Sequence, residues 1–284
     1  MAAEAPAAAG LPPRRRKSVL VRARHHVLTV YAALAFAYLL LPIAVVLLFS
    51  FNAPKGRFNY LWEGFTFDNW IHWDAPPGIR PALMTSIEIA ALSTVIATAL
   101  GTMVALAIVR HSFRGRGSTN LLIFLPMATP EIVLGASLLT LFGNTRFITP
   151  GFLTIFIAHV MFVISYIVVT VKARLVGFDR HLEEAAMDLG ANEWTTFQKV
   201  TLPLLAPAIL SAALLGFALS IDDFVVTYFN AGSETTFPLY VWGAAKIAVP
   251  PQVNVIAGAI FIVALLILFV NVLWQGRRPK GTAA

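Results

Sequence analysis

Four carboxylate side chains lie within apolar stretches of this chain, and no Lys or Arg lies in the same stretches. They are Glu88, Glu131, Asp222 and Asp223. An ionised carboxylate at the centre of a bilayer costs about 2.5 to 3.5 kcal/mol on insertion scales, so such groups are usually functional. A wholly acidic lining suits a cationic substrate. Asp222, Asp223 and Glu131 are therefore candidates to meet positively charged groups, and Glu88 is a weaker candidate. Because Asp222, Asp223 and Glu88 lie about five residues from the ends of their stretches, a solvated position at the membrane surface is the alternative for these three.

The apolar stretches that carry these acids are long enough to cross a membrane. The chain has 284 residues, of which 58% are hydrophobic and only 12% charged, with a mean hydropathy of +0.77. This composition is that of an integral membrane protein. A helical span needs about 20 apolar residues. Six stretches meet this length, and the predicted fold is therefore an all-α bundle of six transmembrane helices at 27–51, 83–109, 119–142, 151–171, 203–227 and 253–274.

The basic residues fix the predicted orientation of these spans. With the amino terminus inside, 16 of the 21 Lys and Arg residues fall on the cytoplasmic side. This asymmetry places both termini in the cytoplasm. We expect a disordered basic tail at 1–26, a transmembrane domain at 27–276 with a cytoplasmic loop at 177–202, and a second tail at 277–284. The net charge of +7 follows from these flanking residues, so the predicted partner is membrane lipid and not nucleic acid.

Several kinds of catalysis find no support in the residues. The chain has no cysteine, and its six histidines show no spacing typical of a metal site, so no metal is predicted. A membrane hydrolase would need Ser165 or Ser220 beside His159, and nothing in their spacing supports this. We expect His159 to be a hydrogen-bonded packing residue. No phosphate-binding loop of the GxxxxGK[ST] type occurs either, so energy from ATP must come through another subunit.

The third predicted span contains two prolines in the sequence LPMATPEIVLG. Pro126 and Pro130 each remove a backbone donor and disfavour straight helix. We therefore expect this span to be kinked or broken near its middle. Broken spans are tolerated where protein or a water-filled path surrounds them, which places Glu131 near a pathway.

The longest polar segment between two spans is HLEEAAMDLGANEWTTFQKVTLP, at 181–203. Asp179 can cap a helix whose first turn holds two glutamates, where carboxylates complement the helix dipole. Gly190 can end this helix of about three turns in a left-handed cap. Asn192 can cap a second helix, and Leu202-Pro203 places a proline at the opening of the next span. The segment is predicted to be a rigid helix-turn-helix that meets a soluble partner.

The spacing within this segment resembles a known signature. Glu184-Ala185-Ala186, three residues, Gly190, nine residues, Val200, one residue and Leu202-Pro203 is similar to the Glu-Ala-Ala loop of ABC importer permeases. The resemblance implies a type I importer (MetI-like) fold whose cytoplasmic coupling helix enters the cleft of an ATPase homodimer. The implied ATPase-coupling residues are Glu183, Glu184, Ala185, Ala186, Asp188, Gly190, Leu202 and Pro203. The chain itself would hold no cofactor, because ATP and Mg would be bound by the partner ATPase.

Further segments resemble a subfamily of these permeases. PEIVLG at 130–135, SIDDFVVTYFNAG at 220–232 and the segment 235–258 look like the second permease of spermidine and putrescine importers. The resemblance implies a non-enzymatic polyamine permease of the bacterial inner membrane, with a second homologous permease and an extracytoplasmic polyamine-binding protein as partners. Tyr228 and Trp242 are then aromatic candidates in the substrate pathway. Iron or thiamine transport by the same machinery remains an alternative. A stand-alone secondary transporter coupled to a cation would not explain the pattern at 181–203.

Overall fold

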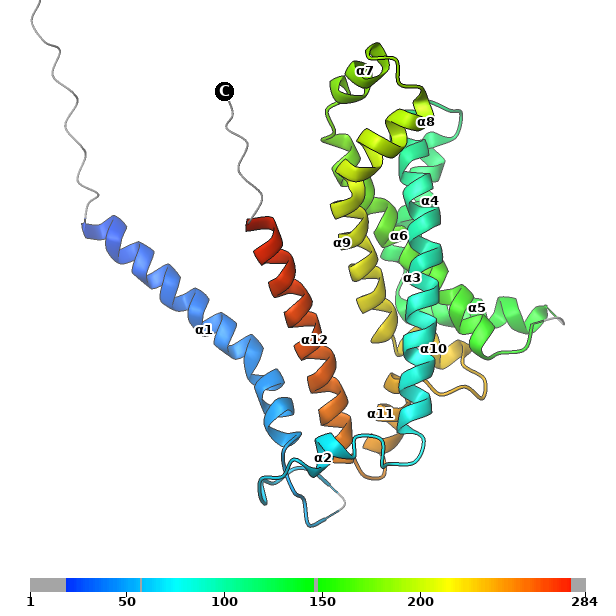
Figure 1. Ribbon diagram of the computed structural model, residues 1–284. Helices are drawn as coiled ribbons and strands as arrows, with labels where there is room; N and C mark the ends of the chain where they lie inside the picture. Colours follow the sequence, from blue (N-terminus) through cyan, green and yellow to red (C-terminus); the bar gives the residue numbers. More distant parts are fainter. Residues whose placement is uncertain (1–18, 57, 146–147, 277–284) are drawn as a thin grey trace, which may run out of the picture.

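The computed structural model describes residues 19–56, 58–145 and 148–276, and these residues are almost entirely helical (Figure 1). Within these ranges the β-structure is an isolated antiparallel bridge between Asn52 and Phe65. The helices are α1 Val19–Phe49, α2 Asp68–Ile71, α3 Ile79–Arg110, α4 Arg116–Ala128, α5 Glu131–Asn144, α6 Phe152–Val176, α7 His181–Asp188, α8 Glu193–Thr196, the π-helical turn η1 Phe197–Thr201, α9 Leu202–Ile221, α10 Val225–Asn230, α11 Phe237–Ala245 and α12 Pro251–Gly276.

The predicted spans each fall on one of these helices or on a pair of them. Among the described residues, four helices are long and apolar enough to cross a membrane, and five if one bent pair counts as a single span. The four are Val27–Phe49 of α1, α3, α6 and the continuous segment Glu193–Ile221. The sixth predicted span lies on α12, whose apolar part Pro251–Ile267 is shorter. The predicted all-α fold is thus confirmed in outline.

Most boundaries shift by a few residues, and two of the differences bear on the predictions. Helix α1 begins at Val19, inside the segment 1–26 that was expected to be a disordered tail, while residues 1–18 lie outside the described part of the chain. The fifth span was predicted to run to Thr227, but α9 ends at Ile221 and α10 starts at Val225. The predicted span was too long because apolar residues continue after the two aspartates, and hydropathy does not register the break.

The packed centre of the molecule consists of α3, α6 and α9. Its core includes Ala97 and Ala105 of α3, Val163 and Ile167 of α6, and Ala212 of α9. Small residues allow the helices to approach closely, as is typical of membrane helix pairs. A Cβ atom on Gly101 would lie 2.8 Å from Ile167 Cγ2, and one on Gly216 would lie 2.7 Å from Val163 Cγ1. These glycines therefore fix the distances between the helices that carry the candidate site.

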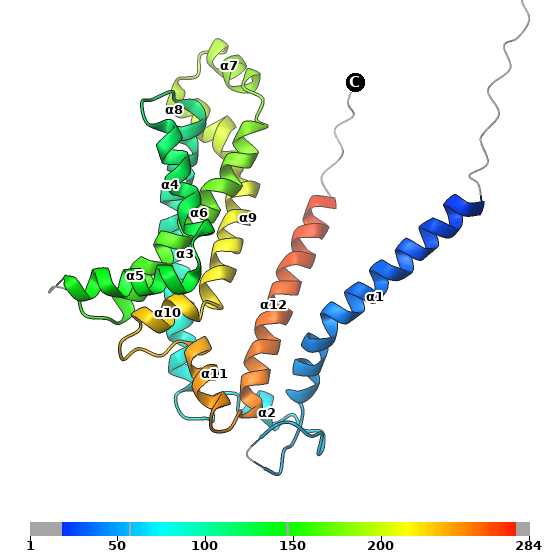
Figure 2. The same ribbon diagram turned by 180° about the vertical axis from the view of Figure 1, so that it is seen from behind.

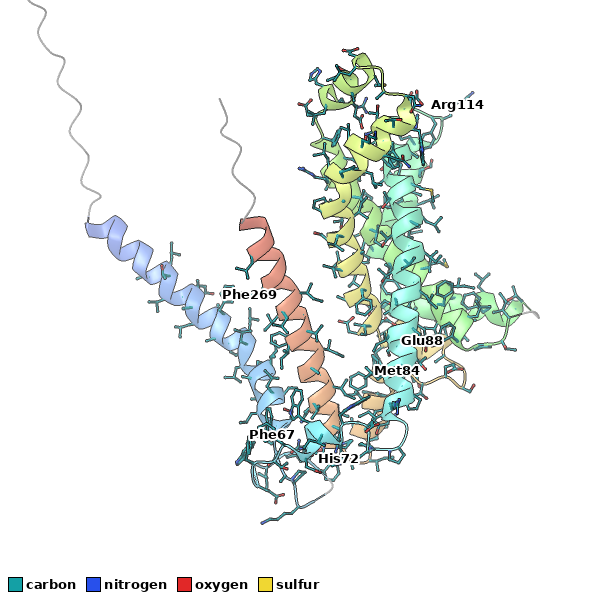
Figure 3. The ribbon with its side chains drawn as sticks, in the orientation of Figure 1. Phe67, His72, Met84, Glu88, Arg114 and Phe269 are labelled. Atoms are coloured by element: carbon teal, nitrogen blue, oxygen red, sulfur yellow. The ribbon has the colours of Figure 1, made fainter. Side chains whose placement is uncertain are left out.

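Helices α1 and α12 stand apart from this centre in both views (Figures 1 and 2). They pack on each other, and a Cβ atom on Gly258 would lie 2.8 Å from Leu47 Cδ2. An apolar cavity of about 670 Å³ lies between α12 and the α3 and α9 side of the bundle. Its lining includes Met84, which Figure 3 shows on α3, together with Phe217 and Ile260.

The third span is broken, as the two prolines predict. Helix α4 ends at Ala128, α5 begins at Glu131, and the two helices are bent by 107°. Thr129 has an extended backbone, with ψ of 131°, because proline disfavours helical geometry in the residue before it. Pro130 then precedes α5 as its cap residue. The prediction of a break near Glu131 is confirmed.

The segment between α1 and α3 is organised by a buried asparagine. Asn52 donates to the carbonyl of Leu61 at 2.7 Å and accepts from the backbone N–H of Glu63 at 2.8 Å. Asn69 donates to the carbonyl of Asn52 at 2.8 Å. Phe51 stacks on Trp70 with ring centroids 5.4 Å apart. Several side chains of this segment, including Phe67 and His72, are exposed at the end of the molecule opposite α7 (Figure 3).

Candidate functional site

The candidate pathway site forms where α9 stops and the chain turns into α10. Asp222, Asp223 and Phe224 make up the connection. Asp222 has φ of −98° and ψ of −3° at the carboxyl end of α9. The two aspartates are adjacent in sequence, but their side chains differ in burial: Asp222 is exposed, whereas the Asp223 side chain is only 6% exposed.

The Asp223 carboxylate contacts several other residues of the protein. Its Oδ2 accepts hydrogen bonds from the backbone N–H and the hydroxyl of Thr227, each at 2.8 Å. Its Oδ1 accepts a longer bond of 3.4 Å from the N–H of Val226. The same Oδ2 lies 3.3 Å from His159 Nε2. The carboxylate therefore satisfies N–H groups in the first turn of α10 that have no partner within the helix. Asp223 holds the start of α10 in place.

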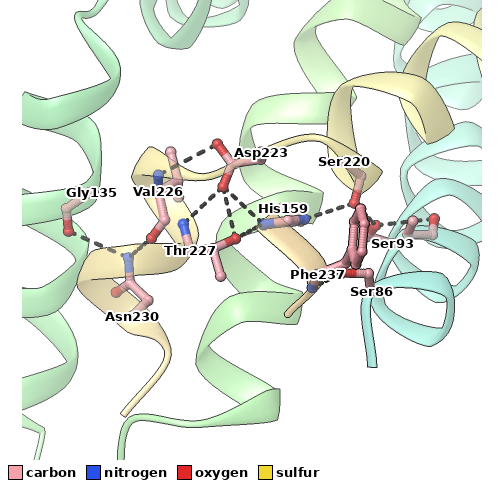
Figure 4. A network of polar contacts seen from close by, with 11 residues as sticks. Ser86, Ser93, Gly135, His159, Ser220, Asp223, Val226, Thr227, Asn230 and Phe237 are labelled. Carbon is pink, nitrogen blue, oxygen red and sulfur yellow. Dashed lines mark hydrogen bonds and ion pairs between the residues drawn. The ribbon is translucent and has the colours of Figure 1, made fainter. Parts of the chain in front are cut away.

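His159 links this capped turn to the centre of the bundle (Figure 4). It is buried, with Nδ1 2.7 Å from Ser220 Oγ and Nε2 2.9 Å from Thr227 Oγ1. Ser220 Oγ in turn lies 3.1 Å from Ser93 Oγ of α3. The network thus connects α3, α6, α9 and α10. The prediction that His159 is a hydrogen-bonded packing residue is confirmed, and the histidine is also a partner of Asp223 that a search for Lys and Arg alone did not find.

Ser220, His159 and Asp223 are the residue types of a hydrolytic triad and contact one another in that succession. Their atoms are not arranged as in such a triad. In such triads the serine bonds to Nε2 and the aspartate to Nδ1 of the histidine. Here the serine bonds to Nδ1, and the aspartate faces Nε2. Ser220 is 4% exposed and shares its hydroxyl with Ser93. These side chains therefore form a buried hydrogen-bonded contact that joins the helices.

Asp222 and Glu131 are the two acids that remain exposed at this place. Asp222 lies close enough to Asp223 and Glu131 for their charges to interact. Glu131 is brought here by the bend of the third span, because α5 packs along α10. A Cβ atom on Gly135 would lie 2.8 Å from Phe229 Cδ2, and Asn230 Nδ2 donates to the carbonyl of Gly135 at 3.4 Å. The broken third span and the end of α9 therefore meet and present their acids together.

Aromatic rings extend from this acidic site. The Phe224 ring lies 5.6 Å from that of Tyr228 and 5.3 Å from that of Trp242, measured between centroids. Both predicted aromatic candidates are exposed. The Trp242 ring already holds a cation, because Lys246 Nζ lies 5.0 Å from its centroid. An ammonium group over an indole face is an attractive arrangement.

Glu88 is set apart from the other predicted pathway acids. It is exposed on α3 (Figure 3), and no hydrogen bond or ion pair to its side chain occurs among the residues that the structure describes. The structure brings together Glu131, Asp222, Asp223, Tyr228 and Trp242. Phe224, which connects them, was not singled out from the sequence, although its position between the acids and Tyr228 offered a signal.

The second candidate site is the cytoplasmic loop at the other end of the bundle. Helix α7 is eight residues long, shorter than the expected three turns because the capping residues occupy both ends. Asp179 Oδ1 accepts from the N–H of His181 at 3.0 Å. Gly190 has φ of +89°, and the N–H of Ala191 bonds to the carbonyl of Ala186 at 3.1 Å. The predicted left-handed glycine cap is confirmed.

The rest of the loop also follows the predicted capping pattern. Asn192 Oδ1 accepts from the N–H of Thr195 at 2.8 Å and begins α8. Pro203 lies in the first turn of α9. Between them, η1 is a single π-helical turn, a rare feature in helices. The loop is therefore a defined helix-turn-helix, continuous with α9.

The predicted coupling residues divide into an exposed and a buried group. Glu184, Ala185, Asp188 and Gly190 are exposed, Ala186 is half-buried, and Leu202 and Pro203 lie exposed at the start of α9. Apolar side chains accompany the exposed group, with Leu189 89% and Trp194 65% exposed. Glu183 differs from them, because it is buried. Its carboxylate accepts hydrogen bonds from Arg110 and Thr201, two residues that the sequence did not point to.

No cluster of three or more His, Asp or Glu side chains that could hold a metal ion is found within the described ranges. The acidic residues of the pathway site lie beside aromatic rings and hydroxyl groups. Ammonium groups donate hydrogen bonds and are attracted to aromatic ring faces, so acceptor oxygens beside aromatic rings suit them.

Comparison with known proteins agrees with this geometry. The family model described as "Binding-protein-dependent transport system inner membrane component" matches residues 97–276. The spermidine/putrescine transport system permease protein PotC of Escherichia coli (strain K12) is 36% identical over 247 residues, which cover 87% of this chain and 92% of the relative. The PotC protein of Haemophilus influenzae is 37% identical over 237 residues, 83% of this chain and 91% of the relative. The putrescine transport system permease protein PotI of E. coli is 36% identical over 244 residues, 82% of this chain and 86% of the relative.

Solved structures support the same fold. A chain of a bacterial ABC transporter involved in the import of the acidic polysaccharide alginate superposes with a TM-score of 0.64 at 18% identity, covering 93% of this chain and 100% of that one. A chain of the MetNI methionine ABC transporter gives a TM-score of 0.51 at 16% identity, covering 71% of this chain and 92% of that one. The predicted importer-permease fold is confirmed. The chain belongs to the family of inner-membrane components of binding-protein-dependent transport systems.

Proposed function

We propose that this chain is one permease subunit of an ATP-driven importer of polyamines, with spermidine and putrescine as the expected substrates. The observation that carries the substrate class is the acidic and aromatic site where the broken third span meets the end of α9. Asp222 and Glu131 are exposed there and close enough to interact, and the Trp242 ring already holds an ammonium group. The names of the curated relatives agree with this chemistry.

Within the site the residues have different roles. Asp222 and Glu131 provide charge for the ammonium groups of a passing polyamine, while Tyr228 and Trp242 offer ring faces to them. Asp223 maintains the turn that presents Asp222, because its own carboxylate is occupied by Thr227 and His159. Glu88 stays a weaker candidate. The second, homologous permease is expected to provide the opposite wall of the path.

The loop at 177–202 is proposed to receive the energy of ATP hydrolysis. Its exposed face, centred on Glu184, Ala185, Ala186 and Gly190, is of the size and chemistry for docking into a cleft of an ATPase dimer, which would bind ATP and Mg. Closure of that dimer would move the docked helices, and α9, which continues directly from the loop, would move with them. This is a rigid-body switch whose two states differ in their affinity for ligands.

The proposed orientation places both chain ends in the cytoplasm. The beginning of α1, the end of α12 and α7 all lie toward one end of the molecule in both views (Figures 1 and 2), and most Lys and Arg residues of the described ranges lie in the segments on that side. The opposite end, with α2, α11 and the segment ordered by Asn52, would then face the extracytoplasmic polyamine-binding protein. The chain would reside in a bacterial inner membrane.

The first test is ATP hydrolysis by the complete complex in proteoliposomes, with its binding protein and a titration of spermidine, putrescine, ferric ion and thiamine. Stimulation by polyamines alone is expected. Stimulation by ferric ion or thiamine would keep the permease function and refute the substrate class. Uptake by the purified chain without the ATPase subunit would instead support a secondary transporter.

A further inference from the structure

The two neighbouring glutamates of α7 have opposite surroundings. The Glu184 side chain is 61% exposed, and within the described ranges its polar partner is His181 of the same helix, at 3.1 Å. The Glu183 side chain is 10% exposed and faces the body of the protein. Successive residues of an α-helix point about 100° apart. Helix α7 therefore has one free face and one anchored face, and Glu183 lies on the anchored face.

The Glu183 carboxylate is the meeting point of three elements. Its Oε1 accepts a hydrogen bond from Nη2 of Arg110, the last residue of α3. The same oxygen accepts from Oγ1 of Thr201, the fully buried last residue of η1. The Arg110 guanidinium also lies 5.9 Å from the centroid of Phe178, in the segment that leads into α7. One oxygen atom thus receives donors from the end of α3 and the start of α9.

Few other polar contacts hold α7 against the spans. Within the described part of the chain, no other α7 side chain forms a hydrogen bond or ion pair with another element. Arg180, the residue before α7, donates to the carbonyl of Val109 at 3.3 Å, again at the end of α3. Among the polar side chains of α7, Glu183 therefore links this helix to α3, and it adds a second link to the start of α9 beside the continuity of the chain.

We infer that Arg110, Glu183 and Thr201 form a clamp that transmits movement of α7 to α3 and α9. Charge-assisted hydrogen bonds are the stronger ones in proteins, and a buried acceptor that loses its donors is destabilised. The three residues therefore move as one body. Glu183 is then a positioning residue for energy coupling, distinct from the exposed docking face. This inference rests on the proposed function, in which that face binds the ATPase subunit.

The decisive quantity is polyamine uptake per ATP hydrolysed, measured with the complete complex in proteoliposomes. For Glu183→Ala we expect the ATPase subunit to co-purify in the normal ratio and ATP hydrolysis to continue. Uptake per ATP should fall by about tenfold, the order expected when a charge-assisted hydrogen bond is lost. Glu183→Gln keeps an acceptor oxygen for both donors and should recover part of this loss.

A matched pair at Thr201 keeps the test informative if the Glu183 variants fold poorly. Thr201→Ser retains the hydroxyl donor and should preserve uptake per ATP, whereas the nearly isosteric Thr201→Val should lower it. Equal coupling in the two Thr201 variants, or normal coupling in Glu183→Ala, would overturn the clamp. Loss of the ATPase subunit from Glu183→Ala would overturn it as well, because Glu183 would then belong to the docking surface.

Glu184→Ala tests the proposed function on which the clamp rests. If the exposed face docks the ATPase subunit, this variant should lose that subunit on purification, together with stimulated ATP hydrolysis. Full retention and full coupling in Glu184→Ala would refute the docking surface, while the Glu183 and Thr201 variants would still report on the clamp separately.

Discussion

Replacement of Asp222 by Asn should impair transport, whereas the same replacement at Asp223 should first impair folding. Both substitutions remove one negative charge and leave the side-chain shape almost unchanged. The Asp222 carboxylate is exposed, and in the described structure it makes no hydrogen bond to another residue. The Asp223 carboxylate is bound to the N–H and hydroxyl of Thr227 and lies beside His159. The charge of Asp222 is therefore available to a substrate, whereas the charge of Asp223 maintains the turn.

The expected magnitudes follow from these contacts. A hydrogen bond to a charged group contributes about 1.5 to 3 kcal/mol and a neutral one about 1 kcal/mol. Asp222→Asn thus weakens a contact with an ammonium group by about 0.5 to 2 kcal/mol, which lowers uptake about two- to thirtyfold. In Asp223→Asn the amide oxygen can still accept both bonds from Thr227, but these bonds and the contact with His159 lose the negative charge, and the amide NH₂ replaces the acceptor that faces the N–H of Val226. The free energy of unfolding of this variant should therefore fall by about 2 to 4 kcal/mol.

Two assays distinguish the variants. Uptake of labelled spermidine into proteoliposomes that contain the whole complex gives the transport rate, and thermal unfolding of the purified complex gives its stability. Asp222→Asn should show low uptake with an unchanged unfolding temperature, and Asp222→Glu, which keeps the charge, should retain most of the uptake. The reasoning is refuted if Asp222→Asn transports normally, or if the two Asn variants have the same uptake and the same unfolding temperature.

Four further substitutions test other parts of the structure. Gly190→Ala places a side chain at φ of +89°, which costs about 1 to 2 kcal/mol, whereas Asn visits this left-handed region more readily. Less ATPase subunit should therefore co-purify with Gly190→Ala than with Gly190→Asn, and equal retention would contradict the cap. Gly135→Ala puts a Cβ atom 2.8 Å from Phe229 and should lower stability by about 1 to 3 kcal/mol, with partial recovery when Phe229→Leu is added. His159→Phe leaves Ser220 and Asp223 without their shared partner, so the unfolding temperature should fall, and an unchanged one would show that the network is not stabilising. Trp242→Leu should raise the KM for polyamine uptake more than Trp242→Phe does, because only the latter keeps a ring face.

The features that the sequence predicted well are local ones. Pro130 imposes an extended backbone on the residue before it, so the break at Glu131 follows from a few neighbouring residues. Gly190 and Asn192 end and begin helices through bonds that span only a few residues, and both caps appear as expected. The candidate acids were recognisable because charge in an apolar stretch is costly wherever the stretch lies.

The partners of these residues were not predictable, because they come from distant parts of the chain. Arg110 and Glu183 are separated by 73 positions, and His159 and Ser220 by 61. Asp222 and Asp223 are equivalent in composition and hydropathy, and only the approach of α6 with His159 makes one of them internal. For the same reason Glu183 and Glu184 were treated as one group. Which of two adjacent acids is buried depends on tertiary packing and not on local preference.

The π-helical turn at Phe197–Thr201 affects how many residues the loop at 177–202 can hold at a given orientation of α7 relative to α9. A π turn contains one residue more than an α turn over the same stretch of axis, as a single insertion into a helix would leave it. The π turn therefore absorbs one residue without turning α7 and α8 relative to α9. Deletion of one residue from the regular part of α9 would instead turn everything before it by about 100° and shift it by about 1.5 Å, so that Glu183 would no longer face Arg110. The chain between Gly190 and Pro203 is thus one residue longer than a regular helix would allow for the same orientation of α7.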